Sequence, residues 1–180
     1  MKFKYETERL ILRILNSSDA GETLRFYKDN RENFQRFEPK RSEKYYTEDY
    51  QRSMLDFEFD CAKRLEGCRY YAFLKEEPNT IMGTASLRNV RWIPHKSCEI
   101  GYRLDYRYIG SGYGQEMVEC ISQVAFADMG LHRLEAYCME ENVPSIKLLE
   151  RTGFEREGLI RDYAEINGVY RDHALYSLLG

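Results

Sequence analysis

The stretch Leu104-Asp105-Tyr106-Arg107-Tyr108-Ile109-Gly110-Ser111-Gly112-Tyr113-Gly114-Gln115 decides the fold, because three alternating glycines join a strand-like run to a long helical pattern. Peptide N–H groups at a helix start have no partner within the helix, and the helix dipole places partial positive charge there. Glycine lets a bulky anion approach such amides closely. The segment therefore predicts a loop that binds a pyrophosphate where a helix begins.

Strands and helices alternate on both sides of this loop. Strands are predicted at residues 7–15, 70–75, 81–90, 97–104, 133–138, 154–163 and 170–178, and helices at 19–30, 47–65, 114–129 and 144–151. Asp19 and Glu22 fit a capping box for the first helix. In the second helix, apolar residues at spacings of three and four predict a core-facing side made of Tyr50, Met54, Phe57, Cys61 and Leu65. Residues 31–46 are expected to be irregular or short-helical.

Composition limits the classes of protein and partner. The 180 residues are 43% apolar and 32% charged, which is typical of one globular domain. A net charge of −3 without a basic stripe argues against nucleic acid as a partner. No apolar run approaches the ~18 residues of a membrane span, and the N-terminus lacks the apolar stretch of a signal peptide, so a cytoplasmic location is expected. The five dispersed cysteines predict reduced thiols, and the three isolated histidines predict no metal site.

The order and spacing of several short motifs resemble the GNAT acetyltransferases, in particular the RimJ/RimL-type family that acetylates ribosomal-protein N-termini and other amines. The motifs are Thr7-Glu8-Arg9-Leu10-Ile11-Leu12-Arg13, Glu99-Ile100-Gly101-Tyr102-Arg103-Leu104, the glycine loop, Glu141-Asn142-Val143-Pro144-Ser145, Leu149-Glu150-Arg151-Thr152-Gly153-Phe154, Glu157-Gly158 and Tyr170-Arg171-Asp172. The resemblance implies a single GNAT-like domain over residues 1–180. Its fold class would be α/β (α+β), with a mixed, mostly antiparallel sheet between helices, and its cosubstrate acetyl-CoA.

The resemblance also assigns a cofactor site. The family motif Gln/Arg-x-x-Gly-x-Gly/Ala falls on Ile109, Gly110, Ser111, Gly112, Tyr113 and Gly114, followed by Gln115. Ile109 departs from the motif, because its side chain cannot donate a hydrogen bond to phosphate. Cofactor binding would lose this bond unless Arg107 supplies the donor. The strand at Tyr102, Arg103 and Leu104 would splay from its neighbour and bind the pantetheine arm, although a fully paired strand is the alternative. Asn142 would line the thioester end, cap the helix that holds Pro144, or do both.

Catalysis needs a proton acceptor, because a protonated amine cannot attack a thioester. Glu99 resembles the family base, and we expect burial to raise its pKa; the alternative is a structural salt bridge. Ser145 is the candidate to hydrogen-bond the leaving sulfur, as well as a cofactor contact, or else it caps backbone amides. Cys138 is interpreted as a packed strand residue, since no activating base is apparent.

The acceptor is the least defined partner. Phe37, Tyr45, Tyr46 and Trp92 either line an aromatic acceptor groove or, as we favour, simply pack. Glu38, Glu43 and Glu48 either attract a cationic amine or are solvated. The acceptor amine remains open between a small molecule and a protein N-terminus, and a homodimer through a terminal strand also remains open. Two rival functions are a non-catalytic acyl-CoA-binding regulator and, less favoured because the glycines read G-x-G-x-G, a dinucleotide enzyme with a Rossmann fold.

Overall fold

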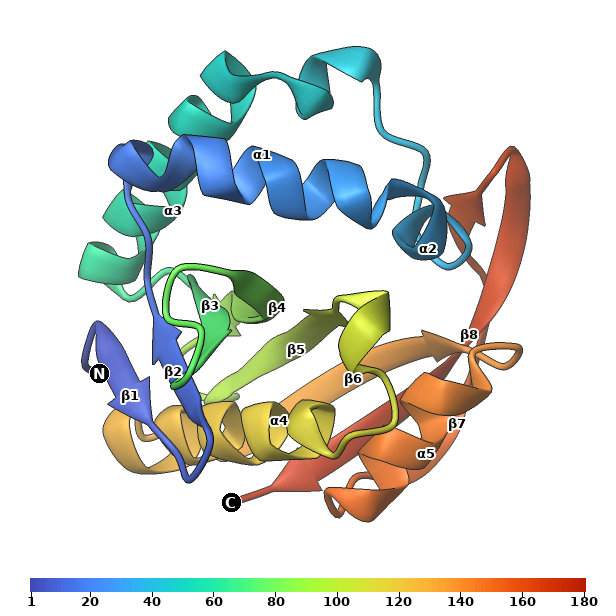
Figure 1. Ribbon diagram of the computed structural model, residues 1–180. Coiled ribbons are helices and arrows are strands. Elements are labelled where there is room, and N and C mark those ends of the chain that lie inside the picture. Colours follow the sequence, from blue (N-terminus) through green and yellow to red (C-terminus); the bar gives the residue numbers. More distant parts are fainter.

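All strands of the protein lie in one sheet. The computed structural model describes residues 1–180 and shows eight strands in the order β1-β2-β3-β4-β5-β6-β8-β7 (Figure 1). They are β1 (Lys4–Glu6), β2 (Leu10–Arg13), β3 (Cys68–Leu74), β4 (Ile81–Arg91), β5 (Ser97–Leu104), β6 (Arg133–Met139), β7 (Glu155–Ile166) and β8 (Val169–Leu179). Only β5 and β6 pair in parallel. The predicted mixed, mostly antiparallel sheet is confirmed.

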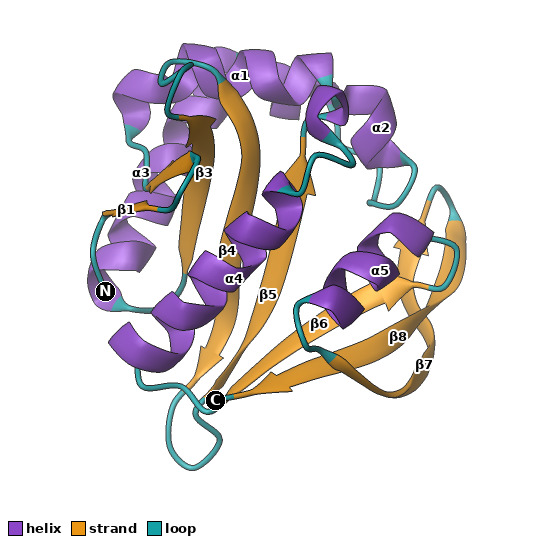
Figure 2. Ribbon diagram, turned by 60° about the horizontal axis from the view of Figure 1, so that its bottom comes forward, coloured by secondary structure: helices purple, strands orange, loops and turns teal.

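Helices cover both faces of the sheet, as expected (Figures 1 and 2). They are α1 (Ala20–Asp29), α2 (Arg31–Gln35), α3 (Glu48–Arg64), α4 (Tyr113–Gln123) and α5 (Val143–Arg151). Side chains alternate across β3: Tyr70 and Ala72 join the core that includes α4 and α5, while Tyr71 and Phe73 join the core that includes α1 and α3. None of the helices combines the length and the apolar composition needed to cross a membrane.

The N-terminal run differs from its prediction in two ways. It forms a β1–β2 hairpin rather than one strand, with the Thr7 amide donating to the Leu10 carbonyl at 3.0 Å. The capping box is also one turn earlier than predicted. Asn16 accepts from the Ser18 amide at 2.9 Å and Asp19 accepts from the Asn16 amide at 3.2 Å, whereas Asp19 caps nothing at the start of α1. The predicted Asp19–Glu22 box is therefore wrong.

The buried side of α3 also differs from the prediction. The helix buries Gln51, Leu55 and Ala62, and leaves Phe57 59% exposed. Gln51 turns inward because its side-chain amide donates to the Tyr45 carbonyl at 2.6 Å, a bond that apolar periodicity cannot reveal. The segment before α3 is short-helical as expected, with α2 followed by a 3-10 turn at Glu43–Tyr46.

Candidate active site

Strands β5 and β6 form a fork, which we define as the divergence of the two chains after their short parallel pairing. Ser97, Cys98 and Glu99 pair with residues 133–135 of β6, and no residue of β5 beyond Glu99 pairs with β6 (Figure 2). On its other side β5 stays paired with β4 as far as Leu104. Every second peptide group of residues 100–104 therefore points into the fork without a strand partner. The predicted splay is confirmed, and the fully paired strand is excluded.

The glycine loop leads from β5 into α4 and leaves its amides open. Gly110 and Gly112 take positive φ angles of +87° and +81°, and α4 begins at Tyr113, so Gly114 lies within its first turn. The N–H groups of residues 112–115 donate to no protein acceptor. A side chain at Gly114 would approach Leu148 Cδ2 of α5 to 3.2 Å, so glycine also lets α4 and α5 pack closely. The loop presents main-chain donors of the kind that bind a phosphate.

Three residues hold the entrance of this loop. Asp105 is fully buried and accepts from the Arg107 guanidinium at 2.9 and 2.8 Å and from the Asn30 side chain at 3.0 Å. Asn30, also fully buried, accepts from the Tyr106 amide at 3.1 Å. Burial alone would raise the pKa of Asp105, but the bonds from Arg107 and Asn30 outweigh it and hold the pKa below its usual value. Arg107 is thus committed to Asp105.

Residues of α5 and β5 meet on one side of the fork. Asn142 is the N-cap of α5, where its side chain accepts from the Ser145 amide at 3.3 Å. The Ser145 hydroxyl lies 2.7 Å from the Tyr102 hydroxyl, so Ser145 contacts β5 rather than capping amides. Burial raises the pKa of Tyr102, and its hydroxyl stays protonated at neutral pH. Cys138 is buried in β6 beneath this pair, as predicted, and burial raises its pKa as well.

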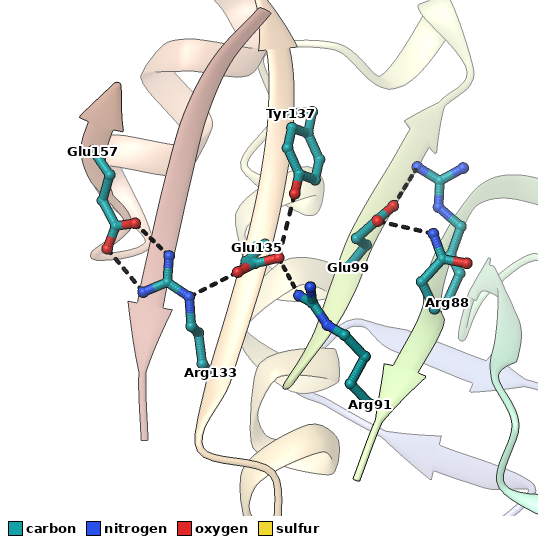
Figure 3. A network of polar contacts seen from close by, with 8 residues as sticks. Arg88, Arg91, Glu99, Arg133, Glu135, Tyr137 and Glu157 are labelled. Atoms are coloured by element: carbon teal, nitrogen blue, oxygen red, sulfur yellow. Dashed lines mark hydrogen bonds and ion pairs between the residues drawn. The ribbon is translucent and has the colours of Figure 1, made fainter. Parts of the chain in front are cut away.

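Glu99 lies on the opposite face of the sheet, at the last paired position before the fork. Its carboxylate accepts from the Asn89 side-chain amide at 2.8 Å and lies 3.9 Å from the Arg88 guanidinium (Figure 3). Asn89 takes a positive φ of 51° where the β4–β5 register shifts, and this irregularity turns its amide toward Glu99. The position of Glu99 is therefore compatible with both alternatives, the proton acceptor and the structural salt bridge.

Next to Glu99, a polar network crosses β4, β6, β7 and β8. Arg91 and Arg133 both bind the Glu135 carboxylate, and Arg133 also binds Glu157 (Figure 3). Tyr137 donates to Glu135 at 3.3 Å and stacks on Tyr163 with ring centroids 4.7 Å apart. These carboxylates are neutralised by arginines. Among the carboxylates drawn in Figure 3, Glu99 differs because its nearest guanidinium is 3.9 Å away, at the limit of an ion pair.

Comparison with known proteins decides the family. The model of the acetyltransferase (GNAT) domain matches residues 9–155. The chain belongs to the GNAT acetyltransferase family. It is 34% identical to a probable N-acetyltransferase of Bacillus subtilis, YjcK, over 94% of this chain and 93% of the other. It is 29% identical to the ribosomal protein uS5-alanine N-acetyltransferase of Escherichia coli over 98% and 91%. The crystal structure of the ribosomal-protein-S5-alanine acetyltransferase of Vibrio fischeri superposes with a TM-score of 0.94 at 30% identity, covering 99% and 97%.

The predicted activity, N-acetylation with acetyl-CoA as cosubstrate, is therefore confirmed at the level of the GNAT family. The residues present fit such a cosubstrate. The unpartnered amides of the glycine loop can donate to a diphosphate, and the unpaired peptide groups of β5 can bond to the amides of the pantetheine arm. The Rossmann alternative is wrong because the glycine loop follows a strand of a mostly antiparallel sheet. The family also favours an enzyme over the non-catalytic regulator.

Tyr45, Tyr46 and Trp92, three of the four aromatic residues considered for an acceptor groove, do not all come together in this GNAT protein. Tyr45 and Tyr46 pack with α1 near Arg103, at the end of β5, whereas Trp92 lies in the turn before β5, so about 20 Å of strand separates them. Arginines also bind all three predicted acidic residues: Glu38 pairs with Arg103 and Arg41, Glu43 with Arg31, and Glu48 with Arg52. Glu43 and Glu48 are exposed, as the solvated alternative predicts, whereas Glu38 is half-buried beside Arg103.

Sequence reasoning missed three residues that shape the cofactor site. Asn30 and Asp105 hold the entrance of the glycine loop, and Glu116 ties the first turn of α4 to the turn between β1 and β2. Arg9 appeared only as part of a family motif, without a role. Spacing gives no signal for these contacts, because 75 residues separate Asn30 from Asp105 and 107 separate Arg9 from Glu116.

Proposed function

We propose that this acetyltransferase acetylates the α-amino group of a protein N-terminus. The observation that carries the proposal is the fork, whose unpaired β5 edge runs from Glu99 to the open amides of the glycine loop. The acceptor class is supported by similarity to uS5-alanine N-acetyltransferases over nearly the whole chain. An enzyme acting on ribosomal proteins would work where ribosomes are assembled, so we also propose a cytoplasmic location.

Glu99 is the proposed proton acceptor. An α-amino group titrates near ~8 and is mostly protonated at neutral pH, so a base must take its proton before attack. When bound, acetyl-CoA supplies the electrophilic thioester carbon that the amine attacks. The Glu99 carboxylate is fixed by Asn89 and Arg88 at the apex of the fork, where it can accept a proton directly or through a water. Its negative charge also favours the approach of an ammonium group.

Ser145 and Tyr102 are proposed to serve the leaving thiolate. Tyr102 remains protonated because burial raises its pKa, so it can donate to the Ser145 oxygen 2.7 Å away. That bond leaves the Ser145 hydrogen free to point at a sulfur. A hydrogen bond to a developing anion stabilises the transition state more than the ground state. The pair therefore acts on the face of the fork opposite Glu99.

The acceptor class is tested with three substrates: a peptide with N-terminal alanine, the same peptide with a blocked α-amino group and an internal lysine, and the polyamine spermidine. Thiol release gives the rate, and mass spectrometry locates the acetyl group. We expect acetylation at the N-terminal amine. Faster reaction with the blocked peptide or with spermidine would contradict the proposed acceptor.

The two roles are tested with Glu99→Gln and Ser145→Ala. We expect Glu99→Gln to lower kcat about 100-fold or more and to shift the pH profile, with the Kd for acetyl-CoA unchanged. Ser145→Ala should lower kcat by about 10- to 100-fold. Glu48→Gln, an exposed carboxylate on α3, is the matched control and should leave turnover intact. Full turnover by Glu99→Gln would refute its role as base.

A further inference from the structure

Arg9, in the turn between β1 and β2, reaches across to the glycine loop. Its Nε donates to Glu116 Oε2 at 2.7 Å, its Nη1 donates to the Ser111 carbonyl at 3.1 Å, and its guanidinium lies 4.3 Å from the centre of the Tyr113 ring. The side chain is 42% exposed. Three contacts therefore hold a solvent-accessible cation in one position at the start of α4.

One nitrogen of this guanidinium is unused. Arg9 Nη2 donates to no protein acceptor, and it lies 3.4 Å from the place that a Cβ on Gly112 would take. Gly112 is the N-cap of α4 and the first of the open amides at residues 112–115. The free N–H bonds of Nη2 therefore lie beside the main-chain donors of the loop.

The cation of the loop is committed elsewhere, and the first position of the motif has no polar donor. Ile109, at the first position of the motif, is 59% exposed and has no side-chain donor. Arg107 gives a bidentate pair of bonds to the buried Asp105. A diphosphate bound by the loop would thus meet main-chain amides but no free cation from the loop itself, whereas Arg9 contacts the loop from outside.

We propose that Arg9 binds the diphosphate of acetyl-CoA and supplies the charge-assisted hydrogen bond that Ile109 cannot make. The proposal rests on the binding of acetyl-CoA at the glycine loop. Arg9 also neutralises Glu116, whose carboxylate in the first turn of α4 would otherwise repel the diphosphate. Burial raises the pKa of Glu116, but bonds from Thr7, the Arg9 amide and the Arg9 guanidinium outweigh it and lower that pKa.

The main test is isothermal titration calorimetry of CoA into Arg9→Gln. Loss of one charge-assisted bond should raise the Kd about 10- to 100-fold and make it less sensitive to salt. Dephospho-CoA keeps the diphosphate but lacks the 3′-phosphate, so its Kd should rise by the same factor. Arg52→Gln, an exposed arginine of α3 that also pairs with a glutamate, is the control and should bind CoA normally.

Two further variants separate a ligand contact from a bracing role. Ile109→Arg added to Arg9→Gln restores a cation beside the loop and should recover most of the affinity. Glu116→Gln removes the partner's charge while leaving Arg9 in place, so it should leave the Kd unchanged or lower it. An equal loss of affinity in Glu116→Gln and Arg9→Gln would show that Arg9 only braces the loop, and would overturn the proposal.

The remaining outcomes separate this proposal from the proposed function. An unchanged Kd in Arg9→Gln, with normal CoA binding by the unaltered protein, would overturn the role of Arg9 and leave the acetyltransferase intact. An effect on CoA but none on dephospho-CoA would place Arg9 at the 3′-phosphate and overturn the diphosphate contact. Failure of the unaltered protein to bind CoA would overturn both proposals.

Discussion

Replacing Asn30 by aspartate should destabilise the protein more at neutral than at mildly acidic pH. Asn30 and Asp105 are both fully buried, and the Asn30 side-chain nitrogen lies 3.0 Å from Asp105 Oδ2. The same nitrogen donates to the Phe26 carbonyl at 3.0 Å. Asn30→Asp replaces this donor with an acceptor and puts two carboxylates in contact without access to water.

The magnitude follows from the lost bond and the new repulsion. Loss of a buried hydrogen bond to a charged group costs about 1.5–3 kcal/mol, and an uncompensated buried charge brings the total to about 3–5 kcal/mol at pH 7.5. Like charges in contact raise the pKa of the pair, so the native state binds a proton that the unfolded state does not. The stability of Asn30→Asp therefore rises as the pH falls toward about 5, by at most ~1.4 kcal/mol per pH unit.

The unaltered protein has the opposite dependence. The folded pKa of Asp105 is lowered, so its contribution is fully present above the unfolded value of ~3.9 and is lost as the pH falls through the folded value. Urea unfolding followed by circular dichroism at pH 7.5 and 5.5 measures the trend of Asn30→Asp, whereas the contribution of Asp105 to the unaltered protein is fully present at both pH values. Asn30→Ala removes the bonds without adding charge, and Asn79→Asp adds an exposed charge in the β3–β4 turn. The same destabilisation of Asn30→Asp at both pH values would refute the reasoning.

Three more predictions concern the loop, the buried ion pair and a core thiol. Gly112→Ala and Gly110→Ala both pay the strain of positive φ, but only Gly112→Ala adds a methyl group 3.4 Å from a guanidinium, so it should weaken CoA binding more in the same titration. Glu38→Gln leaves the guanidinium of Arg103 buried without its carboxylate and should lower the free energy of unfolding by about 2–4 kcal/mol in urea. Burial raises the pKa of Cys98 to about 12, so a thiol reagent at pH 8 should label it only after unfolding; rapid labelling of the native protein would contradict its burial.

Most of the fold could be predicted from the sequence because it is encoded locally. Period-two and helical patterns gave the main strands and helices in the right order, and the glycine loop fell between β5 and α4 as expected. The errors arose where a polar contact overrode periodicity. On α3 the Gln51 side chain turns inward to a carbonyl, and at α1 the box formed around Asn16 because a 3-10 turn precedes the helix.

The site was only partly predictable for a related reason. The fork and the open amides follow from main-chain features that a family resemblance carries, and both predictions agree with the structure. The pairing of Glu38 with Arg103 joins residues 65 apart, and Arg9 reaches a loop 102 residues later. Such contacts depend on the assembled tertiary structure, so the sequence does not reveal that each of the three acidic residues is paired with an arginine.

Side chains that alternate along β5 explain how the leaving sulfur and the attacking amine can be kept on opposite faces of the sheet. Tyr102 projects toward α5 and Ser145, whereas Glu99 projects to the opposite face, and the peptide groups between them open into the fork. A thioester at the apex would thus have its leaving sulfur on the side of Ser145 and its attacking amine on the side of Glu99. Cys138 lies on the leaving-group side, buried and with a raised pKa, so it is poorly placed to take the acetyl group before the amine does. The arrangement therefore favours direct transfer between two substrates bound together over transfer through an acyl-cysteine.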